Sequence, residues 1–228
     1  MIHYHCADIN PHHKLMTGLE GRHLLVSHAY PAPVVIAHQI AQSVLLDNGA
    51  FSVWRSGKKA NWKKYYEWCD MWFDCPTTWG IIPDIIDGGE DAQDDLLEDW
   101  EFGHRGAPVW HLDEGLDRLR WLTHEWPRVC LGSAGEYAEI GTAKWHERMT
   151  EVFNMLTQEE TRLPWLHGLR MQGVGHLYPF SSVDSADIAR NNNRPQNTIR
   201  SMAERWDCAQ PNFRWNQKPT QQPLELFT

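Results

Sequence analysis

The chain has 228 residues, of which 42% are hydrophobic and 13 are tryptophan, and a formal net charge of −9. This length suits one α/β domain, and each large aromatic side chain buries roughly 150–250 Å², so a disordered chain is excluded. The sequence has no apolar run near the ~20 residues of a membrane helix, no signal-peptide pattern, and no close pair among its five cysteines. We expect a cytoplasmic protein without membrane contact, disulfide framework or structural zinc.

Short apolar or β-branched runs alternate with helical patterns along the chain, which is typical of a parallel sheet with crossover helices. Eight strands are predicted, at residues 2–6, 23–29, 44–47, 80–84, 107–112, 128–132, 165–169 and 180–184. Apolar residues at a spacing of three to four predict helices at residues 60–73, 90–100, 115–125 and 142–156.

This order of elements predicts an α/β fold, a compact single-domain (β/α)8 barrel of the triosephosphate-isomerase type. A doubly wound sheet is the structural alternative. The predicted barrel covers residues 1–193. Beyond residue 191 the chain is polar and rich in Pro and Gln, so we expect extended or loosely packed structure there, and an extension at 194–228 that packs on the barrel or trails from it.

Functional groups in such barrels gather where strands end and the following loops begin. Predicted strands end in Asp47, Asp84 and Asp184, and Asp87 and Asp187 follow shortly after two of them. Aspartate is also favoured at helix N-caps and turns, which accounts for any one of these residues. Three carboxylates at one rim indicate a site.

Three segments resemble a known family. Residues 46–52, Leu-Asp-Asn-Gly-Ala-Phe-Ser, resemble the Asp-Ser-Gly-Gly-Phe-Gln signature of tRNA-guanine transglycosylases, the queuine tRNA-ribosyltransferases, and of their DNA-modifying relatives in phages and bacterial islands. Residues 132–136 are similar to the Gly-rich loop with which the family reads the base. Residues 183–187 are similar to the Val-Asp-x-x-Asp segment that holds the nucleophile. The likeness spans residues 47–190, most of the barrel.

The departures from the family pattern indicate a particular branch. Asn48, Ala50 and Ser52 replace the Ser, a Gly and the Gln of the signature. The zinc-binding Cys-x-Cys-x-x-Cys and His of the tRNA enzymes have no counterpart, so no metal or other cofactor is expected. A short, zinc-free relative fits a DNA-acting member better than a tRNA-acting one, located in the host cytoplasm if it is phage-encoded.

The resemblance implies that guanine in nucleic acid is exchanged for a 7-deazaguanine such as preQ0. The exchange would pass through an oxocarbenium-like state and a covalent aspartyl-glycosyl intermediate. The nucleophile would be Asp184, with Asp187 as its competitor, and Asp47 would move the proton. Asp84, or else Asp87, would hold the Watson–Crick edge of guanine. Further pocket candidates are Asn48, Phe51, Gly132, Ser133, Ala134, Gly135, His167 and Arg170, of which the last two could instead bind phosphate.

A nucleotide that leaves the base stack needs a basic and aromatic surface beside the pocket. Residues 54–66 contain five cationic and four aromatic side chains and no acid, whereas seven acidic residues lie within 90–101. The negative net charge therefore leaves one basic face available. An ordinary helix with a buried aromatic stripe and exposed lysines would show the same pattern. The candidate phosphate contacts are Arg55, Lys58, Lys59 and Lys63.

Two other functions remain open. His3 and His5 form the His-x-His with which metal-dependent amidohydrolases begin their metal site, and His28, His111, His167 and Asp184 could complete a ligand set. A metal-dependent barrel hydrolase is thus one alternative. The other is a non-catalytic nucleic-acid-binding barrel, because Asn48 and Ser52 depart from the family signature.

Overall fold

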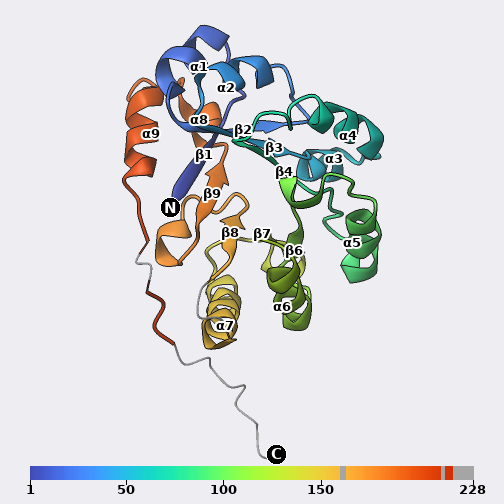
Figure 1. Cartoon of the computed structure of the whole chain (residues 1–228). Coiled ribbons are helices and arrows are strands. Elements are labelled where there is room, and N and C mark those ends of the chain that lie inside the picture. The colour runs from blue at the N-terminus through green and yellow to red at the C-terminus, as the bar shows by residue number, and fades with distance from the viewer. Residues whose placement is uncertain (160–162, 212–213, 218–228) are drawn as a thin grey trace, which may run out of the picture.

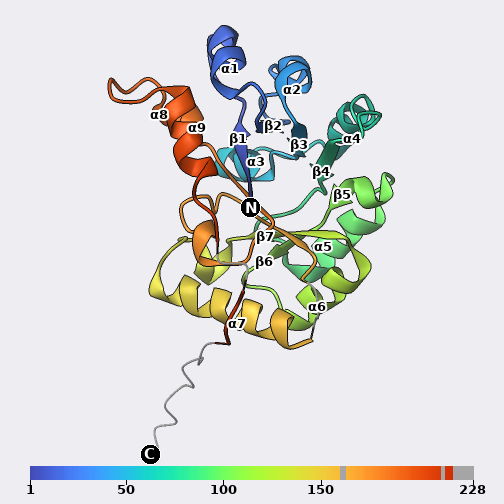
Figure 2. The same cartoon turned by 60° about the vertical axis from the view of Figure 1, so that its left-hand side comes forward.

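The computed structural model describes residues 1–159, 163–211 and 214–217. Its strands form one all-parallel sheet in the order β5-β4-β3-β2-β1-β9-β8-β7-β6. The two edge strands, β5 (Gly106–Ala107) and β6 (Val109–His111), are consecutive halves of one extended segment. β5 pairs with β4 and β6 pairs with β7, so the sheet closes on itself as a (β/α)8 barrel ringed by helices (Figure 1, Figure 2).

Proline explains the break in the closing segment. Pro108 separates β5 from β6, and it has no backbone N–H to donate to a neighbouring strand. Its carbonyl still accepts a hydrogen bond of 2.8 Å from the Cys130 N–H on β7. The segment therefore stays extended and occupies one position among eight in the barrel.

Each of the eight predicted runs overlaps an observed strand, which confirms the barrel and its single domain. The fourth observed strand ends earlier than predicted, so Asp84 lies in the loop beyond it. The remaining strands are β1 (Ile2–Cys6), β2 (His23–Ser27), β3 (Ser43–Asp47), β4 (Thr78–Ile81), β7 (Arg128–Gly132), β8 (Trp165–Gly168) and β9 (Ser182–Ser185).

The four predicted helices are present as α4 (Trp62–Asp70), α5 (Gly89–Glu98), α6 (Leu116–Glu125) and α7 (Ala143–Glu159). Within the described residues, five further short helices lie outside the four ranges where the helical pattern is clearest. They are α1 (His12–Leu19), α2 (Val34–Ile40), α3 (Ala50–Ser56), α8 (Asp187–Asn191) and α9 (Ile199–Asp207). Short 3-10 turns lie at Gly103–Arg105, Gly135–Tyr137 and Gly175–Leu177.

The expectation of extended or loosely packed structure beyond residue 191 is wrong for α9. The Thr198 side chain accepts a hydrogen bond of 3.1 Å from the Ser201 N–H, and the Ser201 hydroxyl accepts one from the Thr198 N–H, which forms a capping box. Ile199, Met202 and Ala203 are buried on one face of the helix, and α9 contacts α1. The polar composition of this segment did not indicate α9, which is an amphipathic helix in the outer ring of helices around the barrel. Residues 212–213 and 218–228 of the predicted extension lie outside the described residues.

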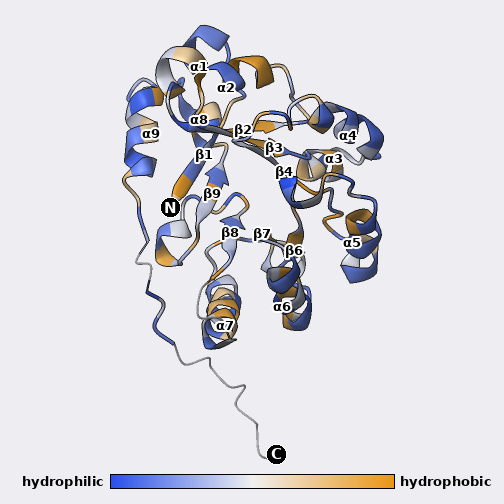
Figure 3. Cartoon of the chain, in the orientation of Figure 1, coloured by the Kyte–Doolittle hydropathy of each residue, from blue (hydrophilic) through white to orange (hydrophobic). Residues whose placement is uncertain are grey.

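Strand residues alternate between the barrel interior and the helix layer. The interior contains Tyr4 and Leu25 with a set of further residues, and the intervening positions pack against helices in two larger clusters. The helices accordingly carry hydrophobic and hydrophilic faces (Figure 3). Within the described ranges, no helix has both the length and the apolar character needed to cross a bilayer. The other buried interior residues are Leu45, Trp79, Ile81, Ala107, Val109 and Cys130.

Candidate active site

Three carboxylates meet at the carboxyl end of the barrel. Asp47 is the last residue of β3 and lies two residues after the interior residue Leu45, so the two side chains share a face of the strand. Asp184 on β9 pairs in register with Tyr4, which also belongs to the interior. Asp84 follows β4 in the adjacent loop. The charges of Asp184 and Asp84 each raise the pKa of Asp47, so the three groups are close enough to interact. The structure therefore brings these predicted residues together at one end.

Asp47 has the electrostatics of a proton-transfer group. Burial raises its pKa to about 7; a hydrogen bond with the Ser27 side chain lowers it, the charges of Asp184 and Asp84 raise it, and the Gly49 backbone lowers it. Near neutral pH both protonation states are populated, as general acid–base catalysis requires. Gly49 has a φ of +76° and a Cβ there would lie 3.1 Å from the Ala29 backbone nitrogen, so glycine suits this turn.

Asp84 is buried and held from two sides. Its Oδ1 accepts a hydrogen bond of 2.8 Å from the Asn48 amide, which also donates to the Ile82 carbonyl at 2.9 Å. Its Oδ2 lies 3.0 Å from His111 Nε2. The competing residue Asp87 lies outside this network and accepts a 3.3 Å bond from the exposed Trp54 indole. Asn48 is therefore a support for Asp84.

His111 lies between two carboxylates, a role that the sequence did not reveal. Besides Asp84, Glu114 Oε1 lies 3.3 Å from His111 Nδ1, and Glu114 Oε2 is 3.1 Å from Arg118 Nε. Burial lowers the pKa of His111, but bonding to Asp84 and Glu114 and the charges of both raise it to about 9. The imidazole is therefore cationic at neutral pH. Arg118 also forms an ion pair with Asp94, with 2.7 Å between Arg118 Nη1 and Asp94 Oδ1.

Asp184 is held by the loop after β8. Arg170 has a φ of 59°, and its backbone N–H donates a 2.8 Å hydrogen bond to Asp184 Oδ1. Its guanidinium lies 3.9 Å from the centre of the Phe51 ring, which belongs to α3. Burial lowers the pKa of Arg170, while the charges of Asp184, Asp47 and Asp84 oppose this effect. Arg170 and Phe51 therefore bridge two loops beside the carboxylates.

Two further predicted residues have different positions from those expected. His167 is fully buried in the barrel, with Nε2 3.3 Å from Asp184 Oδ1, so it does not present a phosphate-binding surface. Asp187 begins α8, where it accepts hydrogen bonds from Asn191 at 2.7 Å and from the Trp206 indole at 2.9 Å. Of the two candidate nucleophiles, the geometry favours Asp184.

Residues of the Gly-rich loop, 132–136, face different surroundings. A Cβ at Gly132 would lie 2.8 Å from the His111 ring, so glycine allows that ring to pack there. Ser133 accepts a 2.9 Å hydrogen bond from the Trp145 indole on α7 and therefore faces the helix layer, and Ala134 is buried. Gly135 lines a cavity of about 380 Å³. The other lining residues are Ile86, Asp87, Gly89, Glu90, His111, Asp113 and Glu114.

His3 and His5 do not reach this end of the barrel interior. They alternate with the inward Tyr4 and therefore face the helix layer. His3 Nε2 lies 2.9 Å from the Ala209 carbonyl, and His5 Nε2 lies 3.0 Å from Asp207 Oδ1. Within the described part of the chain, no group of three or more His, Cys, Asp or Glu side chains is arranged to hold a metal ion. His3 and His5 therefore lie on the other side of β1 from the three carboxylates and do not join the Asp184 carboxylate in one ligand set.

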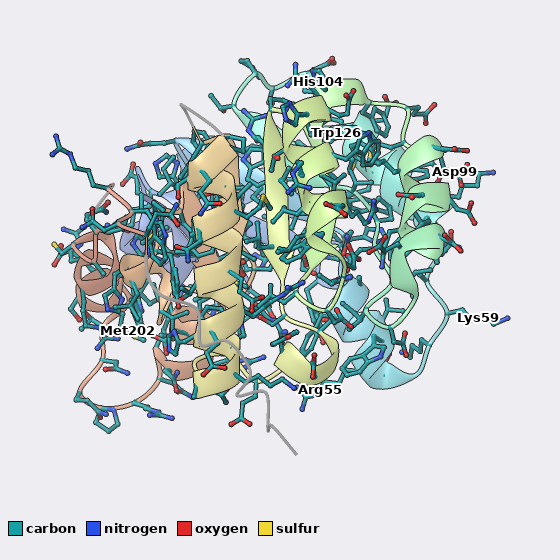
Figure 4. All side chains as sticks on the ribbon, turned by 90° about the horizontal axis from the view of Figure 1, so that it is seen from below. Arg55, Lys59, Asp99, His104, Trp126 and Met202 are labelled. Carbon is teal, nitrogen blue, oxygen red and sulfur yellow. The ribbon has the colours of Figure 1, made fainter. Side chains whose placement is uncertain are left out.

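Residues 54–66 combine the buried aromatic side chain of an ordinary amphipathic helix with an exposed basic and aromatic surface. Tyr65 is buried in the core, as in an ordinary amphipathic helix, whereas Trp54 is 48% exposed. Figure 4 shows Arg55 and Lys59 extending from the ribbon. The four candidate phosphate contacts, Arg55, Lys58, Lys59 and Lys63, are all exposed on α3, on α4 or in the loop between them.

A second and larger cavity lies elsewhere. It has a volume of about 480 Å³ and is lined by residues of α5 and α6 and the loops that follow them, including His104 and Trp126, which Figure 4 labels. The rings of these two residues are 5.6 Å apart. The cavity contains none of the three interacting carboxylates. The described residues that line the smaller cavity include none of these carboxylates either, although His111, which bonds Asp84, is among them. We take the carboxyl end of the barrel, where the three carboxylates interact, as the candidate active site.

Comparisons with protein-family models, with curated proteins and with solved structures find no match for this chain. A function for the site must therefore be argued from its chemistry and from the three motif-like segments.

Proposed function

We propose that this chain is a base-exchanging transglycosylase that replaces guanine in nucleic acid with a 7-deazaguanine through a covalent Asp184-glycosyl intermediate. The observation that supports this most directly is the meeting of Asp47, Asp84 and Asp184 at one end of the barrel. Each comes from a different strand end, and two of them lie in segments that resemble motifs of the transglycosylase family. DNA is the favoured substrate because the zinc-binding pattern of the tRNA enzymes is absent from the sequence.

In the first step Asp184 attacks C1′ of the target nucleotide. Oδ1 is occupied by the Arg170 N–H, and among the described residues no hydrogen bond involves Oδ2, which makes Oδ2 the attacking atom. As the Oδ2–C1′ bond forms, the C1′–N9 bond breaks and its electron pair leaves with guanine. The departing base takes a proton from Asp47, whose pKa of about 7 leaves it partly protonated at neutral pH.

In the second step the incoming 7-deazaguanine gives its N9 proton to the Asp47 carboxylate. N9 then attacks C1′, and Asp184 leaves as a carboxylate. Asp47 thus ends the cycle protonated and Asp184 ends it ionised, so the cycle restores both groups. One carboxyl serves as acid and then as base, as microscopic reversibility requires in retaining glycosyl transfer.

Guanine recognition is assigned to Asp84. Each of its oxygens already accepts one hydrogen bond and keeps a further lone pair for guanine N1–H and the 2-amino group. Adenine offers no such pair of donors. The support from Asn48 and the cationic His111 keeps this carboxylate in place while a base enters or leaves. The exposed cations of α3 and α4 supply a sequence-tolerant contact to the flanking phosphates.

The test is incorporation of labelled guanine or preQ0 into oligodeoxynucleotides and, separately, into tRNA, together with covalent adducts on denaturing gels. Asp184→Asn should abolish both signals. Asp187→Asn is the matched control, because it changes the same side chain three residues away on α8, and it should retain both. If Asp184→Asn retains full exchange, the nucleophile assignment is wrong. If the wild-type protein binds oligonucleotides but forms no adduct and exchanges no base with guanine, preQ0 or preQ1, the non-catalytic barrel is the correct function.

A further inference from the structure

Behind Asp184 three side chains form an ordered chain of hydrogen bonds inside the barrel. The Trp165 indole N–H, which can only donate, lies 2.9 Å from Ser182 Oγ. Ser182 Oγ in turn lies 2.8 Å from His167 Nδ1, and His167 Nε2 lies 3.3 Å from Asp184 Oδ1. We name Trp165, Ser182 and His167 the Asp184 support.

The direction of these bonds determines which nitrogen of His167 carries hydrogen. Ser182 Oγ accepts from Trp165, so its own hydrogen is free to be donated to His167 Nδ1. If Nδ1 carried the hydrogen instead, the Ser182 hydroxyl hydrogen would have no acceptor among the described residues. Nε2 would then point a lone pair at a carboxylate oxygen, which is repulsive. Both arguments place the hydrogen on Nε2, facing Asp184.

The His167 ring has little freedom to turn away. It is fully buried, and the rings of Tyr4 and Trp79 meet it edge-on at 5.8 Å and 5.4 Å between centres. Nε2 is buried and has no hydrogen bond within the described residues at the present geometry. A small approach of Asp184 would complete one. The Asp184 support therefore ends in a ring nitrogen that forms a hydrogen bond once the Asp184 carboxylate comes slightly closer.

We propose that His167 is a positioning residue that holds Asp184 Oδ1 with Nε2–H, so that Oδ2 faces C1′. This inference rests on the proposed transglycosylase function. In the covalent intermediate, Oδ1 becomes the carbonyl oxygen of the glycosyl ester and lies between two donors, His167 Nε2–H and Arg170 N–H. When the ester breaks, negative charge returns to Asp184, and fixed donors aimed at that oxygen stabilise it.

Kinetics of variants test the role. His167→Leu removes the donor and should lower kcat for base exchange about 10²- to 10³-fold, the range seen when one such donor is lost, with little change in KM for the base. His167→Gln retains an N–H donor and should recover much of that loss. Ser182→Ala should lower kcat less. Its matched control is Ser43→Ala, since Ser43 makes similar bonds to His23 and Tyr4 on other strands and should leave kcat unchanged.

A spectroscopic measurement tests the same inference without reference to activity. In protein labelled with ¹⁵N-histidine, the His167 signals, identified by their loss in His167→Gln, should show a protonated Nε2 and an unprotonated Nδ1 that accepts a hydrogen bond. Ser182→Ala should shift the Nδ1 signal, and Ser43→Ala should not.

A protonated Nδ1 in the wild-type protein, in either the neutral or the cationic ring, overturns the inference. Equal kcat for His167→Leu and the wild type does so too. The two failures are distinguishable: absence of base exchange in wild-type protein with the expected His167 signals refutes the transglycosylase, whereas exchange with a protonated Nδ1 refutes only the role of His167.

Discussion

The cationic state of His111 makes stability depend on pH in a defined direction. Its folded pKa of about 9 exceeds the ordinary value of 6.5, so the folded protein holds this proton more tightly than the unfolded chain. The stabilisation is complete below pH 6.5 and is lost as pH rises through about 9. Since the side chain is only 4% exposed, solvent screening is small, and the difference corresponds to about 3 kcal/mol.

His111→Gln removes the titration and keeps a polar side chain. We expect the free energy of unfolding of the wild type, minus that of His111→Gln, to fall by about 3 kcal/mol between pH 6 and pH 10. Urea unfolding followed by tryptophan fluorescence at intervals of one pH unit measures this difference. Subtraction cancels groups that titrate alike in both proteins, such as Asp47.

His3→Gln is the control. The pKa of His3 is lowered to about 4, mainly by burial, so its contribution to stability changes between about pH 4 and 6.5 and is nearly constant above that range. The wild-type minus His3→Gln difference should therefore be flat from pH 7 to 10. If the His111 difference is also flat, or rises with pH, then His111 is not a cation between Asp84 and Glu114 and the reasoning is refuted.

Three further predictions concern the proposed proton-transfer group Asp47, the proposed phosphate contacts and α9. The rate of adduct formation should fall as pH rises through about 7, because Asp47 must be protonated to donate its proton to the departing base. In single-turnover kinetics, Asp47→Asn should lose this pH dependence and slow the step about 10²- to 10⁴-fold. The same pH profile in both proteins would contradict the assignment. The double variant Lys58→Gln/Lys59→Gln should reduce the slope of log affinity against log salt for duplex oligonucleotides by about 2, whereas Lys14→Gln on α1 should change it less; equal effects would argue against a local contact surface. Thr198→Ala should lower the free energy of unfolding by about 1 kcal/mol in urea titrations through loss of the α9 cap, and Thr17→Ala, whose hydroxyl bonds within α1, should cost less; no effect of Thr198→Ala would mean that the cap does not stabilise the fold.

Much of the barrel could be predicted from the sequence because its signals are local. Apolar runs of strand length followed by helical periodicity indicated eight strands, and the parallel order required their carboxyl ends to meet at one edge. Asp47, Asp84 and Asp184 could therefore be placed together without coordinates. The helix α9 was missed because its few buried residues are separated by polar ones, and its stability depends on packing against α1.

Only the tertiary structure decided which side of a strand faces the interior. In β1, His3 and His5 alternate with Tyr4, and either set could fill a barrel interior by size; the register with neighbouring strands turns Tyr4 inward and the histidines toward α9. The pairing of Asp84 with His111 across two strands likewise has no local signature. Sequence periodicity specifies that side chains alternate, whereas closure of the sheet determines which of the two faces lines the barrel interior and the candidate site.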